Sequence, residues 1–141
     1  MKVDLVSSRG IYSLGKTRCP KCPICDLPIK ENPDMHEALI SRGQISNHPR
    51  SLVLDSRYNC VLRHHVCPDK LGSHTGGIGG DEIFEKCARH IVEWEGYYHT
   101  RQWLLSMRYV FPNVGDSALR RFDAIDWNKF KQKTAAKTPN N

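Results

Sequence analysis

Cysteine and histidine residues with the spacing of metal ligands open and close the stretch from Cys22 to Cys67. Cys22 and Cys25 stand three positions apart, and so do His64 and Cys67. A Cys-x-x-Cys turn lets both thiolates face one ion, and tetrahedral Zn²⁺ takes four sulfur or nitrogen ligands at about 2.0–2.3 Å. The spacing therefore predicts a structural zinc site formed by Cys22, Cys25, His64 and Cys67.

The sequence leaves two alternatives open for these cysteines. Cys19, Cys22 and Cys25 form two overlapping pairs, and we prefer the second pair because its Pro-Ile filler suits a tight turn. The six cysteines could instead form disulfides, but the sequence shows no secretory signal, so metal binding is favoured. Cys60 and Cys87 are expected to be buried thiols outside the zinc site.

Residues that suit phosphodiester hydrolysis lie between the two pairs of metal ligands. Hydrolysis needs a base that deprotonates a water and a hard cation that stabilises charge on oxygen. The imidazole of His36 accepts a proton near neutral pH, and Asp34 offers the oxygen ligand that a hard cation prefers. Asn59 is expected either to bind this cation or to fix the chain through its amide.

Two short strands are expected to position these side chains. Residues 34–41 can extend as a strand, which places Asp34 and His36 on one face because side chains alternate along a strand. The Arg-Gly-Gln sequence at 42–44 ends this strand. Residues 59–62 form the second candidate strand, which leads directly into the second pair of zinc ligands.

The order of these motifs resembles that of the HNH, or ββα-metal, nucleases. The resemblance covers about residues 19–71: a Cys-x-x-Cys pair, an acidic-x-His-Glu strand, Asn-x-x-Leu and a closing metal turn. It implies a β-hairpin and a following helix that hold one catalytic Mg²⁺ or Mn²⁺ ion, beside a separate structural zinc. It also implies that His36 is the general base and Asp34 the leading ligand of the catalytic ion.

Two positions depart from the family's pattern. Many members carry adjacent histidines on the first strand, the first an ion ligand and the second the base. If His36 matches the first histidine, Glu37 takes the position of the base. The family also commonly places a histidine ligand of the catalytic ion after the closing pair, where this chain has Pro68. His65 or His74 is the candidate replacement for that ligand.

The charge of the chain favours a nucleic-acid partner. The formal net charge is +6, and the positive excess lies in residues 1–33 and 108–141. Phosphates neutralised by Lys and Arg release counterions, so DNA, or RNA, is the natural partner of such a surface. The candidate phosphate contacts are Arg42, Arg50, Arg57, Arg120 and Arg121.

Helical periodicity governs the second half of the chain. A glycine-rich stretch at 72–80 is expected to be a flexible loop. Helices are predicted after Asp81 and at 97–107, with Gly96 between them, and shorter helices at 117–122 and 123–130 follow a break at 111–115. The aromatic residues Trp94, Tyr97, Tyr98 and Trp103 are expected to belong to the core rather than to a base-stacking platform.

Together these features predict an α+β protein with a zinc-stapled ββα-metal core and a C-terminal helical extension. The expected segments are a basic N-terminal arm at 1–18, the core at 19–80, the helical extension at 81–130 and a disordered basic tail at 131–141. No apolar run approaches the roughly 18 residues that a membrane helix needs, so no membrane partner and a cytoplasmic location are expected.

The resemblance implies a DNA endonuclease, similar to the small free-standing nucleases of bacteriophages. The first alternative is a non-catalytic zinc module that binds nucleic acid or a protein partner. The second is a structural zinc protein that forms a homodimer through residues 81–107.

Overall fold

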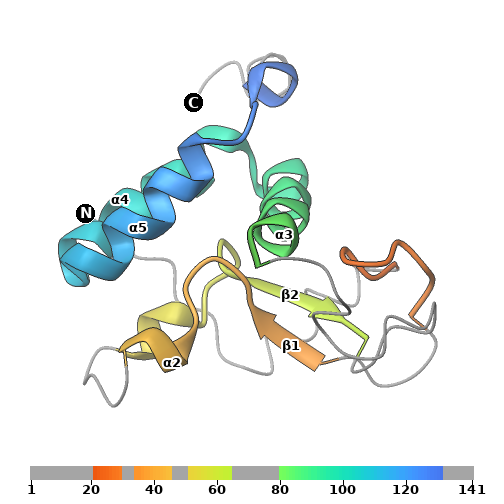
Figure 1. Ribbon diagram of the computed structural model, residues 1–141, viewed down its shortest axis with the longest axis horizontal. Coiled ribbons are helices and arrows are strands. Elements are labelled where there is room, and N and C mark those ends of the chain that lie inside the picture. The colour runs from red at the N-terminus through yellow and green to blue at the C-terminus, as the bar shows by residue number, and fades with distance from the viewer. Residues whose placement is uncertain (1–20, 30–33, 46–50, 65–79, 132–141) are drawn as a thin grey trace.

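The computed structural model describes residues 21–29, 34–45, 51–64 and 80–131 (Figure 1). In chain order the elements are β1 (Asp34–Glu37), α2 (Arg42–Ile45), the 3-10 helix η1 (Ser51–Leu54), β2 (Cys60–Arg63), α3 (Gly80–Glu95), α4 (Tyr97–Val110) and α5 (Pro112–Asp123). Helices and a small antiparallel sheet together confirm the predicted α+β class.

Strands β1 and β2 form a two-stranded antiparallel sheet. The register pairs Asp34 with Arg63, Met35 with Leu62, His36 with Val61 and Glu37 with Cys60. Residues opposite each other on an antiparallel pair point to the same face, and the faces alternate along the strand. Asp34 and His36 therefore share one face of the sheet, as predicted.

The first strand ends at Glu37 rather than at the predicted position 41. One further backbone bond, from the Ala38 N–H to the Asn59 carbonyl at 2.7 Å, prolongs the pairing. The next two amides, of Leu39 and Ile40, donate instead to the side chain of Asn59. The chain turns away from the sheet there, and residues predicted only to end the strand form the short helix α2.

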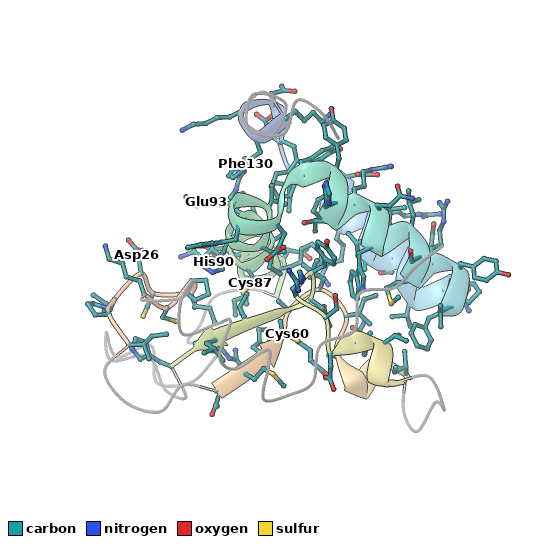
Figure 2. The ribbon with its side chains drawn as sticks, turned by 180° about the vertical axis from the view of Figure 1, so that it is seen from behind. Asp26, Cys60, Cys87, His90, Glu93 and Phe130 are labelled. Atoms are coloured by element: carbon teal, nitrogen blue, oxygen red, sulfur yellow. The ribbon has the colours of Figure 1, made fainter. Side chains whose placement is uncertain are left out.

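Helix α3 packs on β2. It lies between the hairpin formed by β1 and β2 and the C-terminal helical turn at 128–131 (Figure 1). One continuous cluster of buried apolar side chains joins the two halves of the chain: it includes Ile24, Val61 and Leu62 as well as Ile91 and Leu104. The predicted burial of Cys60 and Cys87 is confirmed. Figure 2 shows Cys87 on the side of α3 that faces the start of β2, where Cys60 lies.

Gly96 separates α3 from α4, as predicted. Its φ of 93° is a conformation that glycine adopts readily because it has no Cβ. The Gly96 carbonyl accepts hydrogen bonds from the Thr100 N–H at 3.1 Å and from the Thr100 hydroxyl at 2.8 Å. Helix α4 then continues to Val110, three residues beyond the predicted end.

Helix α4 ends at Val110 and α5 begins at Pro112, so the predicted break at 111–115 is present but is limited to Phe111. Proline is well suited to the first turn of a helix because its missing N–H has no partner there in any case. Gly115, which indicated a loop in the sequence, lies inside α5 because α4 approaches its backbone closely. A Cβ at this position would overlap the backbone of Arg108 and lie 2.6 Å from the carbonyl carbon of Met107.

The predicted helix at 123–130 is present only in its last part. Helix α5 ends at Asp123, and a bend precedes a helical turn that begins at Asn128. The indole N–H of Trp127 donates to the Phe122 carbonyl at 2.6 Å, which holds the bent chain against the end of α5. A tertiary contact of one side chain therefore accompanies the bend at 124–127, where the sequence predicted helix.

Substituting Gly115 with alanine is expected to lower the free energy of unfolding by about 1–3 kcal/mol, because overpacking forces α4 and α5 apart. Chemical denaturation followed by circular dichroism would measure the change. Gly43→Ala is the matched control: a Cβ there meets only Ser41 Oγ at 4.0 Å, so its effect should stay within about 1 kcal/mol. Equal effects of the two substitutions would contradict the packing described here.

The four aromatic residues expected in the core divide into two pairs. Tyr97 and Trp103 are buried, whereas Trp94 and Tyr98 are 50% and 55% exposed. Adjacent residues of an α-helix point in directions about 100° apart, and Tyr97 lies on the face of α4 that is buried whereas Tyr98 lies on its edge. The prediction is therefore wrong for Trp94 and Tyr98.

Candidate metal centre and catalytic strand

Cys22, Cys25 and His64 bring their potential ligand atoms within 4.8 Å of one another. Cys25 Sγ lies 3.3 Å from His64 Nδ1, close to the roughly 3.6 Å expected between a sulfur and a nitrogen bound to one tetrahedral zinc. These three residues can bind a metal ion such as zinc. The predicted fourth ligand, Cys67, and the alternative ligand Cys19 lie outside the described residues.

The ring of His64 is oriented for metal binding through Nδ1. Its Nε2 lies 3.0 Å from the carbonyl oxygen of Pro28, which can only accept, so we assign the N–H to Nε2. The other nitrogen, Nδ1, then carries the lone pair that faces Cys25. Metal-binding histidines commonly have this second hydrogen bond, which fixes both the ring and its tautomer.

A tight turn holds the two cysteines and presents Pro28 to His64. The Asp26 N–H donates to the Cys22 carbonyl at 2.7 Å, and the Cys22 N–H donates to the Leu27 carbonyl at 2.9 Å. Asp26 takes a left-handed conformation with φ of 62°, which aspartate tolerates better than most residues. The predicted turn between Cys22 and Cys25 is therefore present, and the chain reverses after it.

Helix α3 supports the turn from the side. The Lys86 ammonium donates to the Ile24 carbonyl at 3.0 Å, and the side chains of Ile24 and Cys22 are buried in the core. Figure 2 shows the turn around Asp26 to one side of α3. The cysteines therefore belong to the folded core and are not on a free loop.

Asn59 is fully buried and uses its whole hydrogen-bonding capacity on the backbone. Its Oδ1 accepts from the amides of Leu39 and Ile40 at 3.0 and 2.9 Å. Its Nδ2 donates to the carbonyls of Ile40 and Leu54 at 2.9 and 3.0 Å. The sequence left two roles open for Asn59, and in the structure its amide fixes the chain.

The hairpin is thus held at both ends, and Asp34 and His36 lie between the two attachments. His64 directly follows β2, and the last residue of β2, Arg63, is paired with Asp34. The Cys-Cys-His cluster therefore adjoins the end of the sheet at which Asp34 lies. Asn59 ties the opposite end, beyond Glu37. Asp34 and His36 are half-buried on one face of the sheet, whereas Glu37 points to the other face.

Arg63 is a candidate phosphate contact that the sequence analysis missed. It lies opposite Asp34, so its side chain leaves the sheet on the same face as Asp34 and His36. Guanidinium groups bind phosphate well because their donors form a planar fork. Only the register of the two strands could have identified it, because Arg63 is remote from Asp34 in the sequence.

The predicted phosphate contacts occupy different environments. Arg120 is 81% exposed and pairs with Asp116 at 2.9 Å. Arg121 bonds to Asp81 at 3.0 Å and lies 4.1 Å from the centre of the Phe84 ring, so it joins α5 to α3. Arg57 is half-buried.

Several predicted site residues fall outside the part of the chain that the structure describes. They are His65, His74 and Pro68, which concern the missing ion ligand, and Arg50; for Arg42 the structure describes only the backbone, at the start of α2. The catalytic metal ligands after the hairpin therefore stay predictions.

Comparisons with protein-family models, with curated proteins and with solved structures found no match for this chain. Within the described ranges, no helix combines the length and apolar character needed to cross a bilayer.

Proposed function

We propose that the protein is a divalent-metal-dependent endonuclease that hydrolyses phosphodiester bonds in DNA and has a core of the HNH, or ββα-metal, type. The observation that carries this proposal is the hairpin held at both ends, with Asp34 and His36 on one face between the Cys-Cys-His cluster and Asn59. Helix α3 also packs on β2, so the proposed core extends beyond its predicted boundary at residue 80 to include this helix.

His36 is the proposed general base. Its imidazole can take a proton from water near neutral pH, and a fixed strand lets it do so in one orientation. Asp34 would hold Mg²⁺ or Mn²⁺, for which a carboxylate oxygen is a suitable ligand. When bound, such an ion stabilises negative charge on the phosphate oxygens. Arg63 is placed to contact the phosphate beside Asp34.

The hairpin favours His36 over Glu37 as the base. Asp34 and His36 share a face, whereas Glu37 is paired with Cys60 on the opposite face. A base and an ion ligand must converge on the same phosphate, which two residues on one face can do.

Replacing His36 with alanine is expected to slow DNA cleavage by at least about 100-fold, the usual contribution of a general base. Conversion of supercoiled plasmid to nicked or linear DNA in Mg²⁺ or Mn²⁺ would measure the rate, with EDTA as the metal-free arm. His99→Ala is the matched control, because His99 is exposed on α4 and lies outside the proposed site. Zinc content should be equal in all samples.

Glu37→Gln tests the other assignment of the base. If this substitution abolishes cleavage while His36→Ala retains it at a higher metal concentration, Glu37 is the base and His36 an ion ligand. If no variant cuts plasmid, branched DNA or RNA with any divalent metal but all bind nucleic acid, the endonuclease proposal is wrong and the non-catalytic zinc module is correct.

A further inference from the structure

A surface pocket of about 420 Å³ lies where the start of α4 meets the chain that follows α5. Tyr97, Tyr98 and Arg101 of α4 line it together with Asp123, Trp127 and Lys131. The C-terminal turn lies on the side of α3 away from the sheet (Figure 1). The pocket is therefore separate from the metal cluster and from His36.

The floor of the pocket is made of fixed aromatic rings. Tyr97 and Trp127 are 6% and 3% exposed, and both rings pack on Phe122, with centroids 5.7 and 4.7 Å away. The hydrogen bond from the Trp127 indole to the Phe122 carbonyl adds a polar constraint. These side chains shape the pocket but do not offer an open ring face.

Arg89 fixes the C-terminal segment onto α3. Its guanidinium lies 5.7 Å from the ring centres of both Trp127 and Phe130, and it pairs with Glu85 at 2.8 Å. Figure 2 shows Phe130 between the C-terminal turn and α3. The pocket is consequently preorganised, which lowers the entropic cost of binding.

Tyr98 is the ring at the edge of the pocket that is available to a ligand. It is 55% exposed and meets Tyr97 edge to face, with centroids 4.9 Å apart and planes at 85°. A ring has two faces, and one such contact covers at most one of them, so at least one face of Tyr98 is not covered by Tyr97. An exposed tyrosine face of this kind can stack on a nucleobase, and every base has a matching π-face.

The polar groups of the pocket suit a nucleotide. Arg101 donates two hydrogen bonds to Asp123, both at 2.9 Å, and these bonds raise the pKa of Arg101. Lys131 Nζ lies 5.1 Å from the Tyr97 ring centre and supplies a cation for phosphate. The carboxylates of Asp123 and Asp126 can accept from the N–H groups of a base, whereas a cationic peptide side chain would meet Arg101 and Lys131.

We propose that this pocket binds an unpaired nucleotide of a DNA strand, with the base stacked on Tyr98 and a neighbouring phosphate near Lys131. Such a nucleotide occurs in single-stranded or branched DNA, and the choice of DNA as the substrate rests on the proposed nuclease function. Its test measures binding and does not require cleavage.

Tyr98→Ala is expected to weaken binding of a fluorescein-labelled single-stranded thymidine oligonucleotide by about 5- to 100-fold, the usual effect of losing one stacked base. Fluorescence anisotropy without added Mg²⁺ would measure it. Tyr109→Ala is the matched control, because Tyr109 is on the same helix, is 86% exposed and does not line the pocket. Lys131→Ala should lower the salt dependence by about 0.7 in log–log slope.

The outcomes separate this inference from the proposed function. If Tyr98→Ala and Tyr109→Ala bind equally well, or if a duplex of the same length binds as tightly as the single strand, the pocket inference is wrong whatever the protein cuts. If neither the wild type nor His36→Ala cleaves DNA, but binding of the single strand depends on Tyr98, the nuclease proposal is wrong and the pocket inference holds. A uridine oligonucleotide that binds more tightly than the thymidine one would assign the pocket to RNA and overturn the choice of DNA.

Discussion

Removing zinc with a chelator is expected to unfold the protein cooperatively. Apparent binding free energies of structural zinc are about 10–16 kcal/mol in small metal domains, which is comparable to the entire stability of a typical domain. Cys22 lies in the same continuous core as the buried residues of α3, α4 and α5. Unfolding of the turn that carries Cys22 and Cys25 should therefore also lower the melting temperature of the helices. Far-UV circular dichroism with and without chelator would measure this change.

Single substitutions should identify the ligands of the predicted zinc site. If four ligands share the binding free energy, losing one costs about 3 kcal/mol, or about 100-fold in zinc affinity. We expect this loss for His64→Ala and Cys25→Ser, measured by competition with a chromophoric chelator. Cys87→Ala is the control for a buried thiol outside the cluster.

The fourth ligand can be assigned in the same experiment. Cys67→Ser should reduce zinc affinity as much as Cys25→Ser does, and Cys19→Ser should leave it unchanged. The reverse result would place Cys19 in the site. Protein that is purified without chelator and contains no zinc by native mass spectrometry would contradict the zinc site altogether.

Asn59→Ala is expected to lower the free energy of unfolding by about 4 kcal/mol or more. The substitution removes a partner from each of four backbone groups, at Leu39, Ile40 and Leu54. A buried polar group left without a partner costs about 1–3 kcal/mol, and the Leu54 carbonyl keeps its contact with the Cys60 thiol at 3.5 Å. Urea denaturation would measure the loss, and it would be a large part of the stability of the whole domain.

Two further variants make the Asn59 prediction specific. Asn113→Ala is the matched control, because Asn113 is exposed near the start of α5, and it should change stability by no more than about 0.5 kcal/mol. Asn59→Asp keeps the shape but cannot donate to the two carbonyls when ionised, so it should also destabilise strongly. A stability of Asn59→Asp close to that of the wild type would show that the two donated bonds contribute little.

Features that depend on local chemistry could be predicted from the amino-acid sequence. The Cys22–Cys25 turn follows from the spacing of two thiolates, and the boundary at Gly96 follows from the one residue type that adopts positive φ without strain. The shared face of Asp34 and His36 follows from the two-residue period of a strand. The α+β class followed from these same local patterns.

Features that depend on contacts between distant segments could not be predicted in this way. From the sequence, Asn59 could either bind a metal ion or hold the chain through its side-chain amide. The backbone groups of residues 39, 40 and 54 surround this amide, so it holds the chain. Gly115 indicated a loop by composition, but it lies within α5 because α4 approaches its backbone there. Arg63 and the pocket beside Tyr98 arise from strand register and from the return of the chain after α5. Local propensity extends over a few residues, whereas these contacts join residues far apart in the chain, and their energies outweigh the local preference.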